Sequence, residues 1–159
     1  MRPSFRSSPS RQRGAGLIEV LVAVLVMGVG LLGIAAMQTT ALRNSQSSLE
    51  RSQSVVQTYS ILEAMRANRA DALAGAYNTN GWMCAVPAGG TPANNDRAAW
   101  IASLKATMGV AGDTTTCGQI VCQNTGACTI TVRWDDQRAS DGPAAAGSAT
   151  RDTVTQTQL

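Results

Sequence analysis

Few side chains in this 159-residue chain could do chemistry, and Glu19 stands out among them. It is the only charged residue between Leu17 and Met37, in a run of 21 residues that are otherwise apolar or glycine. A helix of that length rises about 31 Å, close to the thickness of the hydrocarbon core of a bilayer. A carboxylate inside such a segment is costly to insert, and it therefore predicts a functional site.

Four cysteines, all beyond the apolar run, form the second chemical set: Cys84, Cys117, Cys122 and Cys128. An even number in an exported domain predicts two disulfides. A zinc site is the weaker alternative, because the spacing contains no C-x-x-C pair. Four cysteines allow three connectivities. We favour Cys122–Cys128 across a hairpin turn, with Cys84–Cys117 tying the middle loop to the first strand.

Other candidate sites are weak. The sequence has no histidine, no convincing nucleophile setting and no phosphate loop, so it offers no catalytic constellation and predicts neither an enzyme nor a bound cofactor. Gly28–Gly33 has the form G-x-G-x-x-G, but a dinucleotide site needs a preceding strand. Asp135, Asp136 and Asp141 could hold a cation; we favour a solvated turn there and predict no metal site.

Residues 1–14 carry Arg2, Arg6, Arg11 and Arg13 and no acid. Basic flanks stay in the cytoplasm, so the apolar helix should run outward and place the rest of the chain outside. The remaining residues hold nine basic and ten acidic side chains, so the net charge of +3 comes from the N-terminal segment and does not predict nucleic acid binding. A signal peptide cleaved after Gly33-Ile34-Ala35 and a plain single-pass anchor are alternatives that leave Glu19 unexplained.

The segment Gly14-Ala15-Gly16-Leu17-Ile18-Glu19 and the apolar run after it resemble the class III leader of type IV pilins and pseudopilins. The resemblance implies that a prepilin peptidase cuts after Gly14 and that the new N-terminus, Ala15, is methylated. Glu19 is then the fifth mature residue, and it would pair with the α-amine of Ala15 on a neighbouring subunit. The family usually has Phe or Met at the first mature position, where this chain has Ala15.

Within that family the chain is most similar to the PilV type of minor pilin, in three segments: 17–33, 63–69 and 130–136. This implies a structural subunit that primes or modifies pilus assembly and contacts other minor and major pilins through its N-terminal helix. It would sit in the inner membrane with a periplasmic C-terminal domain and then in the pilus on the cell surface. The alternatives are a type II secretion pseudopilin and a membrane-anchored periplasmic enzyme or binding domain.

The expected fold is α+β and pilin-like, with a long N-terminal helix packed on a small antiparallel sheet and stapled by disulfides. We predict a leader at 1–14, a transmembrane and assembly half of the helix at 15–37, an amphipathic half at 38–70 and a globular region at 71–159. The helix should run from about residue 16 to about residue 69, with a break near residues 38–40 as the alternative. An apolar stripe is expected to face the sheet: Leu42, Leu49, Val56, Tyr59, Leu62 and Met65.

Shorter elements are expected in the globular region. Residues 71–92 read as a loop, and Asp96 could cap a short helix that ends before Gly109 and carries an apolar side of Trp100, Ile101, Leu104 and Met108. Two strands are predicted at 119–122 and 128–134, the second with Cys128, Ile130, Val132 and Trp134 facing inward. Residues 141–150 read as a loop. Residues 151–159 fit an edge strand and a loose tail equally well.

Overall fold

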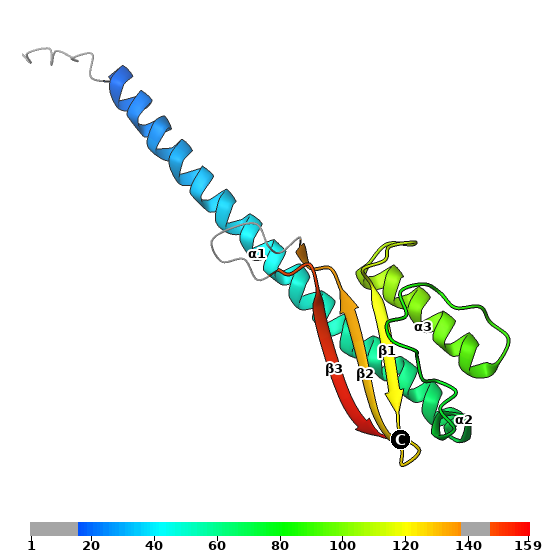
Figure 1. Cartoon of the computed structure of the whole chain (residues 1–159). Helices are drawn as coiled ribbons and strands as arrows, with labels where there is room; N and C mark the ends of the chain where they lie inside the picture. The colour runs from blue at the N-terminus through cyan, green and yellow to red at the C-terminus, as the bar shows by residue number, and fades with distance from the viewer. Residues whose placement is uncertain (1–15, 138–146) are drawn as a thin grey trace, which may run out of the picture. The chain divides into compact units, whose positions relative to one another are not determined.

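The computed structural model describes residues 16–137 and 147–159 (Figure 1). Gly14, Ala15, the four N-terminal arginines and Asp141 therefore lie outside the described residues. The chain divides into two compact units, residues 1–39 and 40–159, and each is described by itself. Helix α1 (Gly16–Ala67) begins in the first unit and ends in the second.

In the first unit, residues 16–39 are helical throughout, and nearly all of their side chains are exposed. The large apolar side chains from Leu17 to Met37 are between 49% and 81% exposed. Within the described residues, α1 is the one helix that is long and apolar enough to cross a membrane. A helix that is apolar on all sides needs lipid or other helices around it.

Residues 38–40 are part of α1, so the predicted alternative of a break there is wrong. The helix ends at Ala67, two residues before the expected end, and Arg69–Leu73 form the separate short helix α2. The segment predicted as a loop from residue 71 therefore begins inside α2.

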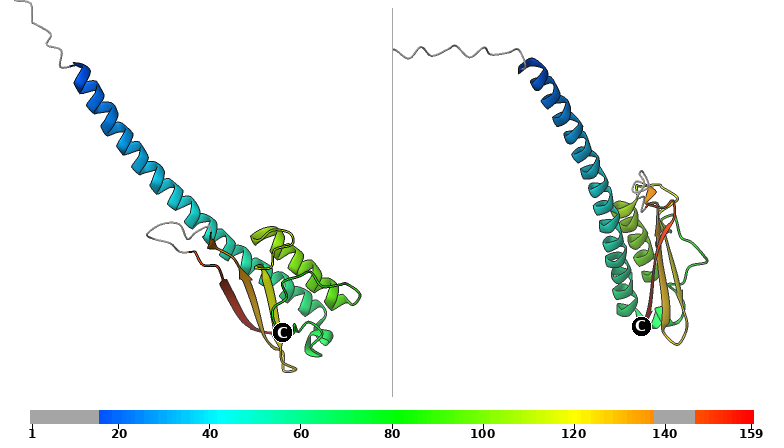
Figure 2. Two further views of the ribbon diagram at one scale, coloured as in Figure 1. Left: turned by 45° about the horizontal axis from the view of Figure 1, so that its top comes forward. Right: turned by 90° about the vertical axis from the view of Figure 1, so that its left-hand side faces the viewer.

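The second unit joins the end of α1 to α2, α3 (Pro92–Met108) and a three-stranded sheet. The strands are β1 (Cys117–Cys122), β2 (Ala127–Trp134) and β3 (Arg151–Gln158), in the order β1-β2-β3. Both pairings are antiparallel, and Ile130 of β2 lies between Ile120 of β1 and Thr155 of β3. The helices of this unit lie on one face of the sheet (Figure 2). Of the two readings left open for residues 151–159, the structure has the edge strand.

A single core lies between this face of the sheet and the helices. Met65 of α1, Ile101 of α3 and Ile130 of β2 are fully buried in it. Gly118 lets Trp100 pack directly on β1, because a Cβ at Gly118 would lie 2.4 Å from the indole ring. The α+β architecture with a small antiparallel sheet and two disulfides is the predicted fold.

Helix α3 begins earlier than predicted. Its N-cap is Thr91, whose hydroxyl accepts a hydrogen bond of 3.2 Å from the N–H of Asn94, and Pro92 follows it at the first helical position. Asp96 is therefore not the cap; its carboxylate accepts a hydrogen bond from the hydroxyl of Tyr77. A threonine followed by proline is a stronger start signal than an aspartate within the helix. The predicted end at Gly109 is confirmed.

The apolar stripe predicted to face the sheet is wrong in its first four positions. Their side chains are 57–67% exposed: Leu42, Leu49, Val56 and Tyr59. Only Leu62 and Met65 are buried, together with Ile61. Along most of the part of α1 that belongs to the second unit, the inward face carries polar residues instead, namely Ser47, Ser54, Gln57 and Thr58.

Candidate assembly site

Glu19 lies in the first turn of α1, where its side chain is exposed. None of the described residues makes a hydrogen bond or an ion pair with it. A carboxylate near a helix N-terminus is favoured by the helix dipole. In an apolar environment, however, it also needs a cationic or hydrogen-bonding partner. The geometry leaves Glu19 accessible to a group from outside the described chain.

Three glycines interrupt the apolar run between Leu17 and Met37. A Cβ added at Gly28, Gly30 or Gly33 would meet nothing within 4 Å. These glycines are therefore not required by packing inside the described structure. Small residues on apolar helices permit close approach of a second helix.

The inward face of α1 in the second unit is held by polar side chains. The hydroxyl of Ser47 donates a 2.6 Å hydrogen bond to the carboxylate of Asp136, just beyond the end of β2. Both side chains are buried, with exposed fractions of 6% and 2%. Arg151, the first residue of β3, lies 3.4 Å from the same carboxylate. The N–H of Asp136 also donates to the carbonyl of Ser148. Asp136 therefore joins α1 to the ends of two strands.

This position of Asp136 corrects the predicted solvated turn. The preceding residue, Asp135, does lie in a turn, where its carboxylate accepts a hydrogen bond from the N–H of Gln137. Burial of Asp136 is possible because Ser47 and Arg151 supply a hydroxyl donor and a positive charge. Sequence reasoning missed Ser47 as well, and a serine at a heptad spacing from Ser54 is the signal that could have found it.

Two further contacts follow the same face. The hydroxyl of Ser54 lies 2.9 Å from the hydroxyl of Thr153 on β3. The carbonyl of Gln57 accepts a 3.0 Å hydrogen bond from the indole N–H of Trp100, and its side chain donates to Ser103 of α3. These bonds explain how polar residues occupy the face that binds the sheet and α3.

The disulfides are Cys84–Cys117 and Cys122–Cys128. This is the pairing favoured from the cysteine spacing. The first joins the loop before α3 to the start of β1, and the second closes the hairpin between β1 and β2. No cysteine is free. Such bonds stabilise a small domain mainly by restricting the unfolded chain.

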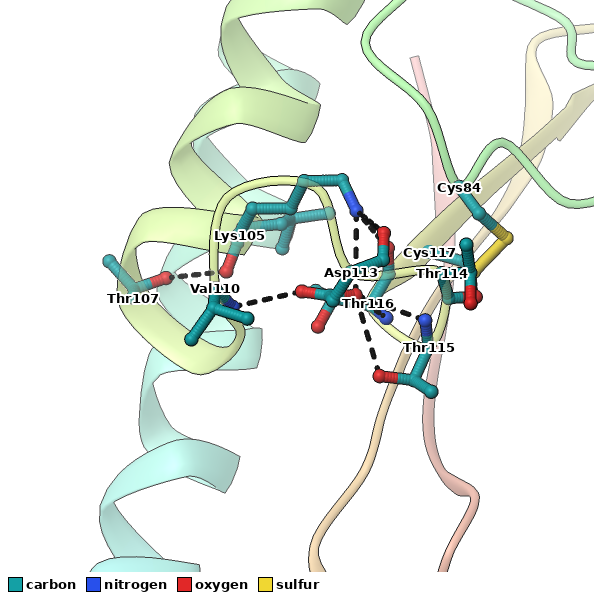
Figure 3. A network of polar contacts seen from close by, with 10 residues as sticks. Cys84, Lys105, Thr107, Val110, Asp113, Thr114, Thr115, Thr116 and Cys117 are labelled. Carbon is teal, nitrogen blue, oxygen red and sulfur yellow. Dashed lines mark hydrogen bonds and ion pairs between the residues drawn. A yellow bond between two sulfur atoms is a disulfide. The ribbon is translucent and has the colours of Figure 1, made fainter.

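The loop between α3 and β1 is built around Asp113 (Figure 3). Its carboxylate accepts hydrogen bonds from the N–H groups of Val110, Thr115 and Thr116, and the ammonium of Lys105 lies 3.4 Å away. Burial alone would raise the pKa of Asp113, but the N–H groups of Thr116 and Val110 and the charge of Lys105 lower it to about 2. The network fixes the entry to β1 beside the Cys84–Cys117 disulfide (Figure 3).

Within residues 16–137 and 147–159, no group of three or more His, Cys, Asp or Glu side chains could hold a metal ion. What the described arrangement offers is a surface for association: an uncovered apolar helix with one accessible carboxylate, and a separate disulfide-bonded unit. The predicted processing residues Gly14 and Ala15 cannot be placed on it, since they lie outside the described residues.

Comparison with protein families gives a match to the prokaryotic N-terminal methylation motif over residues 9–35. The matched residues include Gly14, Ala15 and Glu19. Neither the comparison with curated proteins nor that with solved structures gives a significant match.

The matched motif is the type IV pilin-like signal, and it covers the apolar start of α1. It supports the pilin and pseudopilin superfamily, whose members are structural proteins, and it implies processing by a prepilin peptidase, association with other pilins and anchoring in a membrane. The N-terminal segment of this chain thus carries the prokaryotic N-terminal methylation motif, a type IV pilin-like signal, and it precedes an α+β, disulfide-bonded second unit.

Proposed function

We propose that the chain is a minor type IV pilin that primes or modifies pilus assembly. The observation that carries the proposal is the methylation motif over residues 9–35, which contains a carboxylate five residues beyond the Gly14–Ala15 bond. The uncovered apolar surface of residues 16–39 agrees with a segment that is shared between the membrane and a helical bundle.

In this proposal the peptidase cuts after Gly14 and frees the α-amine of Ala15, which is then methylated. Before assembly the chain spans the inner membrane once, with residues 40–159 in the periplasm. During assembly Glu19 pairs with the α-amine of Ala15 on a neighbouring subunit. A carboxylate in a low-dielectric bundle is strongly destabilising without such a partner, so the pair sets the register of adjacent subunits.

A matched pair of variants tests the role of Glu19. Glu19→Gln removes the charge in the apolar run, and Glu63→Gln removes a charge from the exposed Glu63–Arg66 pair on the same helix. We expect both variants to insert in the membrane and to be processed. Only Glu19→Gln should be lost from sheared pili, as measured by immunoblotting. Equal incorporation of the two variants would contradict the pairing of Glu19.

The second candidate is a pseudopilin of a type II secretion system, because the matched motif is common to both groups. Neighbouring genes separate the two candidates. Genes for other minor pilins next to this one favour the pilus, and genes for secretion components favour the pseudopilus.

A further inference from the structure

The two edges of the sheet differ in how their backbone groups are bonded. On the β1 edge, three residues of the loop before α3 bind three alternate residues of the strand. The pairs are Met83 with Gly118, Thr79 with Ile120 and Asn78 with Cys122. Each strand residue has both its N–H and its C=O bonded, at distances of 2.7 to 3.1 Å. The β1 edge is therefore sealed.

The register shows which groups lie on the opposite edge. Residues of an antiparallel strand alternate between bonding one neighbour and bonding the other. Ile120 uses its N–H and C=O to bind the loop, so the residues on either side of it in β1 bind β2. Ile130 and Val132 of β2 lie opposite the loop-bound residues of β1, and they therefore bind Thr155 and Thr153 of β3. The N–H and C=O groups of Asp152, Val154 and Gln156 then point away from β2, along the free edge of the sheet.

No described residue outside β3 binds these outward groups. The β3 sequence, Arg-Asp-Thr-Val-Thr-Gln-Thr-Gln, contains no proline, glycine or lysine, and its register with β2 has no bulge. Proteins commonly use those features to block strand addition at an edge. An eight-residue strand with a free row of donors and acceptors matches another extended backbone.

The charge on this edge is already neutralised within the chain. Both carboxylate oxygens of Asp152 accept 2.8 Å hydrogen bonds from the guanidinium of Arg133, which also lies 3.8 Å from the centre of the Trp82 ring. The other exposed side chains of β3 are those of Val154, which is 58% exposed, and of two glutamines. An uncharged strand with a small or β-branched residue opposite Val154 fits this row best.

We propose that the β3 edge binds an extended, uncharged strand of one neighbouring pilin-like subunit, and that the sealed β1 edge binds none. This inference rests on the proposed function for the identity of the neighbour. In an assembly, this chain then accepts an added strand at one edge of its sheet only, beyond β3. Head-to-tail addition of further copies through β3 and β1 is blocked by Asn78, Thr79 and Met83.

Proline at position 156 tests the edge without breaking the sheet. Gln156→Pro removes an outward N–H, which an edge strand tolerates, whereas Gln156→Ala keeps that N–H and serves as the control. Both full-length variants should fold, as shown by circular dichroism and by formation of both disulfides. The neighbour is captured by a photo-crosslinking amino acid at Val154 in the producing bacterium, with the same group at Val121, 49% exposed on β1, as the second control.

We expect a crosslink from position 154 to another pilin-like subunit, identified by mass spectrometry, and none from position 121. Gln156→Pro should reduce that crosslink by about fivefold or more, as expected for loss of one hydrogen bond, and Gln156→Ala should not. Any one of four results would overturn the proposal. The first two are no crosslink from position 154 and a crosslink from it only to a second copy of this chain. The others are crosslinks of equal yield from position 121 and equal crosslink yields in Gln156→Pro and Gln156→Ala. Determining the mature N-terminus of the same samples keeps the two proposals apart, since an unprocessed chain contradicts the proposed function alone.

Discussion

The two parts of α1 differ in which of their side chains are exposed and which are covered. Residues 16–39 are apolar on every side and are exposed, with Glu19 as their one charge. Residues 40–67 instead use serine, threonine and glutamine to bind the sheet and α3 over much of their length, and only the last turns bury large apolar side chains. Apolar residues on a helix therefore do not by themselves identify the face that is covered within the chain. Here they also mark surface that is left uncovered.

The largest difference is expected from truncating apolar side chains of α1. Met65 is fully buried and Leu42 is 67% exposed, although both belong to the stripe expected from sequence. Met65→Ala should cost about 2–5 kcal/mol of unfolding free energy, because it leaves a cavity. Leu42→Ala should change it by less than about 0.5 kcal/mol. Urea unfolding followed by circular dichroism in detergent measures both; similar losses would remove the distinction.

The same substitution should have different consequences for membrane insertion in the two parts. Val26→Lys places a charge near the centre of the apolar run and should cost about 2.5–3.5 kcal/mol of insertion free energy. Val56 is 59% exposed in the second unit, and Val56→Lys should leave insertion unchanged. Carbonate extraction of membranes measures the outcome. If Val26→Lys remains fully membrane-integrated, residues 16–39 do not form the membrane segment.

Acid should destabilise the second unit through Asp113. Its folded pKa of about 2 is lower than its usual value of 3.8, so its stabilising effect is complete above about pH 4 and is lost as the pH falls from about 4 to about 2. The effect is about 2 kcal/mol at most. Asp113→Asn should be less stable than the natural chain at pH 6, and the difference should shrink towards pH 2. A constant difference across that range would show that the ionised carboxylate is not what stabilises the loop.

An effect of similar size is expected at the polar face of α1. Ser47→Ala removes the donor to the buried carboxylate of Asp136 and should cost about 1–3 kcal/mol. Ser48 is exposed on the next position of the helix, and Ser48→Ala should be neutral or slightly stabilising. Equal stabilities of the two variants would mean that the Ser47–Asp136 contact does not hold α1 to the sheet.

Several features that depend on residues close together in the sequence were predicted correctly. The long helix, the hairpin with its Cys122–Cys128 bond and the inward side of β2 follow from local periodicity and spacing. The start of α3 was mispredicted because Thr91 and Pro92 outweigh Asp96 as a start signal. The covered face of α1 was mispredicted because it depends on partners about 90 or more residues away, Asp136 and Thr153, which no local pattern reveals. The seal on β1 likewise depends on Asn78 and Thr79, which sequence reads only as loop residues.

Glu19 was identified from sequence alone, because a single charge in an apolar run is visible without a structure. Its proposed partner, the α-amine of Ala15, lies outside the described residues and on another subunit.

Mass spectrometry of the N-terminal peptide from membrane-purified protein decides whether the chain is processed as a type IV pilin. We expect a chain that begins at Ala15 and carries a methyl group on its α-amine. It also predicts that Gly14→Glu retains residues 1–14. A natural chain that still contains its four N-terminal arginines, or one cut after Ala35, would show that the chain is not processed as a pilin.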